Sequence, residues 1–77
     1  MKIECPHGVT FIARTQRTTD KTIASIVEII RPDGTKSTVQ SFEYSTYAQP
    51  VQRVRGIAYR EAVRSANVLA ENFMYLN

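Results

Sequence analysis

The last third of the chain has the clearest pattern of apolar and polar positions. From Pro50 onward, apolar residues recur in steps of three or four. They are Val51, Val54, Ala58, Ala62, Ala66, Leu69, Phe73 and Leu76. This spacing lines up one face of an α-helix. Pro50 suits a helix start, because its φ is already helical and it lacks only an N–H that would have no partner there. We therefore predict a long helix over residues 50–76, roughly 40 Å in length.

The first half of the chain has the patterns of strands and turns. Residues 9–17 alternate apolar and polar side chains with one exception, which is typical of a half-buried strand. Residues 1–8 form either a short strand or a loop, since Pro6 and Gly8 break regular structure. The polar residues 18–21 predict a turn.

The segment 22–31 fits two structures. It could be a helix that is capped by Asp20 and stopped by Pro32. Five of its ten residues are Ile or Val, however, and β-branched side chains suit a pleated sheet better than a helix. The Pro-Asp-Gly sequence at 32–34 is a strong turn signal, and residues 35–47 are rich in Thr, Val, Phe and Tyr. We predict a hairpin, with the helix as the alternative.

Together these elements predict an α+β fold. It is a three-stranded antiparallel β-sheet in the order β-β-β-α, packed against one long C-terminal helix, in a single small domain over residues 1–77. The predicted core is the apolar stripe of the helix on one face of the sheet, with Phe11, Leu69 and Phe73 buried.

A three-residue turn sets the expected register of the hairpin. Counting from it places Ile29 opposite Ser37, Val27 opposite Val39, and Ala24 opposite Phe42. In this register Phe42 and Tyr44 lie on the face that the helix does not cover. That face then keeps apolar side chains in solvent, which is typical of a partner or self-association surface.

Composition narrows the class of protein. The only cysteine is Cys5, which excludes an internal disulfide and fits a reducing compartment. No signal-peptide core and no apolar run of membrane-spanning length is seen, so we expect a cytoplasmic protein outside the membrane. The net charge of +3 is compatible with nucleic acid or with an acidic protein partner.

Candidate catalytic and metal-binding residues are few. Cys5 and His7 could approach one metal ion, but a structural zinc needs four ligands and the chain has no other Cys or His. The sequence has neither a glycine-rich phosphate loop nor a nucleophile elbow. We therefore expect no metal, no cofactor and no enzymatic activity.

The outer face of the helix is the first candidate for function. Arginine and tyrosine, which are enriched in binding surfaces, alternate there with apolar residues. The candidate partner-binding residues are Arg53, Ile57, Arg60, Arg64, Val68 and Tyr75. They suggest a protein-binding regulator whose partner has an acidic or phosphate-binding surface. In size and simplicity the chain is similar to the host-takeover and anti-defence proteins that phages encode. That resemblance implies an inhibitor that covers a surface on a larger nucleic-acid-handling complex.

The alternative is a small DNA- or RNA-binding module that uses the sheet face or the basic helix. The layout resembles that of certain integrase N-terminal domains and plant AP2-type domains, which lay their sheet on the DNA major groove. This resemblance implies nucleic-acid contacts from the sheet, and the residues placed to make them are Arg14, Gln16, Lys36, Phe42 and Tyr44. The arginines concentrate on the helix instead, with four in residues 50–77. A homodimer is a further arrangement that the uncovered sheet face allows.

Overall fold

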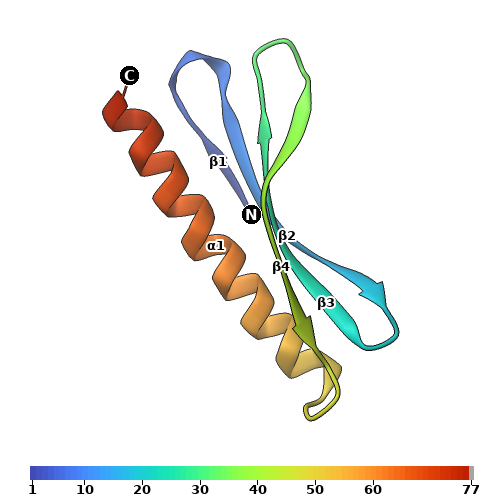
Figure 1. Cartoon of the computed structure of the whole chain (residues 1–77). Helices are drawn as coiled ribbons and strands as arrows, with labels where there is room; N and C mark the ends of the chain where they lie inside the picture. Colours follow the sequence, from blue (N-terminus) through green and yellow to red (C-terminus); the bar gives the residue numbers. More distant parts are fainter. Residues whose placement is uncertain (77) are drawn as a thin grey trace.

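The computed structural model describes residues 1–76 and has one sheet with one helix against it (Figure 1). Its elements are β1 (Lys2–Glu4), a 3₁₀ turn (Pro6–Gly8), β2 (Thr10–Thr19), β3 (Thr22–Ile30), β4 (Lys36–Ser45) and α1 (Val51–Leu76). The strands are antiparallel and follow the order β1-β2-β3-β4. The predicted α+β class and the C-terminal helix are confirmed, but the sheet has four strands rather than three.

The additional strand is β1, which pairs with the first half of β2. Its register places Ile3 opposite Phe11, and the amino group of Met1 donates a hydrogen bond to the carbonyl of Ala13 at 2.8 Å. Three residues are too few to display an alternating pattern. The turn that follows brings Gly8, at φ +76, against the β3–β4 turn, where an added Cβ would lie 3.3 Å from Pro32.

The segment 22–31 is a strand, as predicted, and it occupies the interior of the sheet between β2 and β4. Six consecutive residues of β3, from 23 to 28, are buried. A strand covered on both faces has an apolar run instead of strict alternation. This explains why its sequence also fitted a helix.

A β-bulge changes the register of β3 with β4. The pair Ile29–Ser37 is as predicted, but Val39 is an extra residue between Thr38 and Gln40. The predicted pairs Val27–Val39 and Ala24–Phe42 are therefore wrong. The actual pairs beyond the bulge are Val27–Gln40, Ile26–Ser41, Ser25–Phe42, Ala24–Glu43 and Ile23–Tyr44. Because side chains alternate between faces, this one-residue shift places Phe42 and Tyr44 on the helix side of the sheet.

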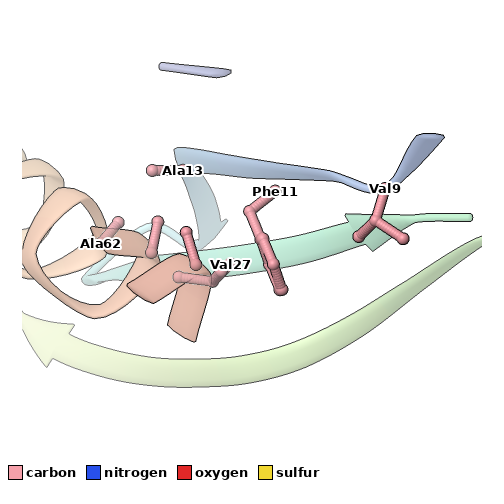
Figure 2. Packing of buried hydrophobic residues seen from close by; sticks show 7 residues of the cluster. Val9, Phe11, Ala13, Val27 and Ala62 are labelled. Atoms are coloured by element: carbon pink, nitrogen blue, oxygen red, sulfur yellow. The ribbon is translucent and has the colours of Figure 1, made fainter. Parts of the chain in front are cut away.

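Small side chains hold α1 against the sheet. One buried cluster joins Ala62, Ala66 and Ala70 of the helix to the sheet residues Val9, Phe11, Ala13 and Val27 (Figure 2). A second cluster, near the start of α1, contains Ile23, Val54 and Ala58, with Tyr44 and Val51 packed beside it. No helix among the described residues, α1 included, is both long and apolar enough to cross a membrane.

The buried residues of α1 coincide with the predicted apolar stripe only as far as Ala66. Phe11 is buried as predicted, but Leu69 and Phe73 are only half-buried, and Ala70 takes the central position in their place. Four residues turn the helix by about 400°, so a line of contacts in steps of four winds slowly around the helix and follows the twist of the sheet. The side chain of Leu76 lies outside the described residues.

Candidate protein-binding surface

The six predicted partner-binding residues all lie outside the core of the protein. Arg53, Arg60, Arg64, Val68 and Tyr75 are exposed, and Ile57 is half-buried. Four of them follow one another at spacings of seven, four and seven residues and so form a single line along α1. We call this line, which consists of Ile57, Arg64, Val68 and Tyr75, the outer flank. Arg53 and Arg60 lie in a neighbouring line on α1.

Arg64 and Val68 start on the side of α1 away from the sheet, because each lies midway between two of the buried alanines at 62, 66 and 70. The long side chain of Arg64 nevertheless extends toward β4. Tyr44 packs against the cluster around Ile23 and Val54, and it is close enough to Arg64 to interact with the charge of the guanidinium. Phe42 precedes Tyr44 by two residues and points to the same side of the sheet. Since α1 lies mainly over β2 and β3, it leaves Phe42 uncovered, with 48 % of the residue exposed.

We group the candidate residues of these two elements under one name, the helix–β4 surface. They are Ile57, Arg64 and Val68 from α1 and Phe42 and Tyr44 from β4. Val68 is 44 % exposed, comparable with Phe42. Exposed apolar side chains on two neighbouring elements, with a guanidinium beside them, give this surface a mixed apolar and basic character.

The guanidinium of Arg64 is held in place by Glu61. Its Nε donates to one carboxylate oxygen at 3.1 Å and its Nη2 donates to the other at 2.5 Å. These hydrogen bonds raise the pKa of Arg64 and lower the pKa of Glu61. A two-point contact of this kind fixes the plane of the guanidinium, so less conformational entropy is lost when a partner binds it.

The residues of the predicted nucleic-acid site do not come together. Arg14, Gln16 and Lys36 lie on the face of the sheet away from the helix, whereas Phe42 and Tyr44 lie on the helix side. Arg14 is also engaged internally: its Nη1 donates to Gln16 Oε1 at 2.7 Å, and its Nε donates to a carboxylate oxygen of Glu28 at 2.8 Å. The bulge at Val39 causes this separation, because it moves Phe42 and Tyr44 to the helix side of the sheet.

Cys5 and His7 do not point to a metal or catalytic site. Cys5 is half-buried, and this burial raises the pKa of its thiol, while His7 is exposed on the following turn. Within residues 1–76 no three His, Cys, Asp or Glu side chains lie close enough to hold a metal ion, and the surface of this part of the chain has no pocket. No family model, curated protein or solved structure matches this chain.

Phe42 and Tyr44 are the residues of the helix–β4 surface that the predicted register placed on the wrong face of the sheet. The sequence has no signal that decides their face. A regular strand could place Val39 on one face and Phe42 and Tyr44 on the other, and the extra residue depends on how β3 and β4 pair.

Proposed function

We propose that this protein is a non-enzymatic binding module that regulates a protein partner by covering part of its surface. The helix–β4 surface is the binding face. The observation that carries the proposal is the exposure of Phe42 and Val68 on adjacent elements, beside an arginine whose orientation is fixed. Aromatic and arginine side chains are enriched in protein interfaces, and a few such residues dominate binding free energies.

The charges around this face define the partner's chemistry. Arg60 lies next to the outer flank and is exposed, so it adds a cation at the rim. A rim of cations around an apolar centre fits a partner surface with carboxylates or bound phosphates at its edge. The apolar centre supplies affinity, and the rim charges speed the approach of the two proteins.

A pair of matched substitutions tests this assignment. Val68→Asp places a charge in the helix–β4 surface, whereas Met74→Asp places one about 120° around α1 from it, at a similarly exposed residue, 44 % against 47 %. Each tagged variant is used to capture partners from a nuclease-treated lysate of the source cells, and captured proteins are identified and quantified by mass spectrometry. We expect a partner that the parent and Met74→Asp capture equally and that Val68→Asp loses. Equal capture by both variants would remove the function from this surface.

A further inference from the structure

The net charge of the protein is concentrated at one end of the molecule. Arg17, Lys21, Arg53 and Arg55 lie where the β2–β3 turn meets the start of α1, and we call these four residues the basic end. Asp20 is the carboxylate that lies among them. The six remaining Lys and Arg residues are matched by six remaining Asp and Glu residues. One of these, Glu43 at the end of β4, lies on the other face of the sheet from Arg17.

Hydrogen bonds hold the two parts of the basic end together. The backbone N–H of Thr46 donates to the carbonyl of Lys21 at 2.8 Å, which joins the β2–β3 turn to the loop before α1. Within the turn, the guanidinium of Arg17 donates to the carbonyl of Asp20 at 2.9 Å. Figure 1 shows this turn and the first residues of α1 at the same end of the molecule.

The arginines at the start of α1 are placed against the helix dipole. Arg53 lies in the first turn of α1, and Arg55 comes directly after that turn. The positive end of the helix dipole lies here and repels cations. Arg17 pairs with Ile23, whose side chain packs against Val54, so Arg17 lies on the same side of the sheet as these arginines. Cations at the N-terminus of α1 are unfavourable for folding, but they strengthen the positive electrostatic potential at the basic end.

Exposed tyrosines accompany these cations. Tyr47 is 80 % exposed, and Lys21 Nζ lies 4.9 Å from the centre of its ring. Tyr59 is also exposed and follows Arg55 by one helical turn. The exposed aliphatic residues Val39 and Val68 lie elsewhere. Cations interleaved with exposed aromatic rings fit a single strand of nucleic acid, because phosphates meet the cations and bases stack on the rings.

We propose that the basic end binds the phosphate backbone of single-stranded nucleic acid, with a base stacked on Tyr47. This interaction goes beyond the protein-binding function, because it uses a different surface from the helix–β4 surface. Four phosphate contacts give a slope of log affinity against log salt of about −3 on a single strand.

The test is a titration of a fluorescein-labelled oligothymidine by fluorescence anisotropy at several salt concentrations. Lys21→Gln/Arg55→Gln removes two cations from the basic end, and Lys2→Gln/Arg31→Gln removes two exposed cations from elsewhere, so both variants have the same net charge. We expect the control variant to keep the parental slope. The basic-end variant loses two contacts, and its slope falls to about −1.5.

Tyr47→Ser separates stacking from charge. We expect it to weaken binding of the oligothymidine severalfold and to leave binding of inorganic polyphosphate unchanged. Three results would overturn the proposal: no binding by the parent at low salt, equal weakening by both charge variants, or equally tight binding of a labelled polyglutamate. The last result would assign the basic end to an acidic protein.

The two proposals fail separately. Val68→Asp leaves oligonucleotide binding at the basic end unchanged, and Lys21→Gln/Arg55→Gln leaves nuclease-resistant capture of the protein partner unchanged.

Discussion

Arg14 and Glu28 form an ion pair on the face of the sheet that no helix covers, with 2.8 Å between Nε and the carboxylate oxygen. Glu28 is only 7 % exposed, although it lies on this open face, because neighbouring strands and the Arg14 side chain surround it. The hydrogen bond from Arg14 lowers the pKa of Glu28 against the opposing effect of burial.

This pair predicts an acid-sensitive contribution to stability. Because the pKa of Glu28 is lower in the folded protein, its contribution is complete above the ordinary pKa of 4.5 and is lost as the pH falls through the folded value. We expect Glu28→Gln to cost about 1–2 kcal/mol at pH 7, discounted because Arg14 is partly exposed, and to cost less at pH 3. Urea denaturation at both pH values measures this. A cost that does not change with pH would contradict it.

The edge-to-face pair of Phe11 and Phe73, with ring centres 6.3 Å apart, predicts unequal costs of truncation. Phe11 is buried and Phe73 is half-buried, so more surrounding contacts are lost at Phe11. We expect Phe11→Ala to cost about 3–5 kcal/mol and Phe73→Ala about 2–3 kcal/mol. Chemical denaturation of both variants measures these two costs. A larger cost for Phe73→Ala would show that Phe73, and not Phe11, is the more important core residue.

The buried alanines of α1 predict that enlarging one of them is strongly destabilising. Ala66 has no exposed surface, so a larger side chain must lift the helix from the sheet. We expect Ala66→Leu to cost at least about 3 kcal/mol, the upper part of the range for overpacking. Asn67→Leu, one residue along on the exposed side, serves as the control and should melt close to the parent.

The bulge predicts that one deletion in the sheet is tolerated. Without Val39, the pairs Glu28–Thr38 and Val27–Gln40 become consecutive in a regular ladder, and no side chain changes face. We expect the deletion to cost roughly 1 kcal/mol or less. Deleting Ser25 from β3 would turn part of the central strand over and should abolish folding. Circular dichroism melting curves compare the two.

The contact between Arg64 and Glu61 predicts that lysine cannot replace this arginine. Arg64→Lys keeps the charge but loses the two-point contact with the carboxylate. We expect it to weaken partner binding by about 1–2 kcal/mol, and Arg60→Lys to change binding little, because rim charges act mainly on the association rate. Binding of the identified partner to both variants, measured by calorimetry, decides this. Equal losses would show that only charge matters.

Sequence patterns predicted the long elements because their signals extend over many residues. The helix over 51–76 repeats its apolar spacing for seven turns, and the buried strand over 22–30 is dense in Ile and Val. Short-range features were missed. β1 has three residues, too few for a period, and the bulge at Val39 depends on how two strands pair. The same limit affected the candidate surface, because the bulge left Phe42 and Tyr44 assigned to the wrong face of the sheet.

The alanines at 58, 62, 66 and 70 also affect how the helix is positioned along its own axis. Because they are identical and spaced by four, a shift of α1 by one turn, about 6 Å, would present nearly the same surface to the sheet. The packed methyl groups of these alanines therefore keep α1 close to the sheet, but they do little to prevent it from sliding along its own axis. Larger side chains make contacts near the two ends of α1, Val54 with Ile23 and Phe73 with Phe11. These contacts determine the position of the helix along its axis.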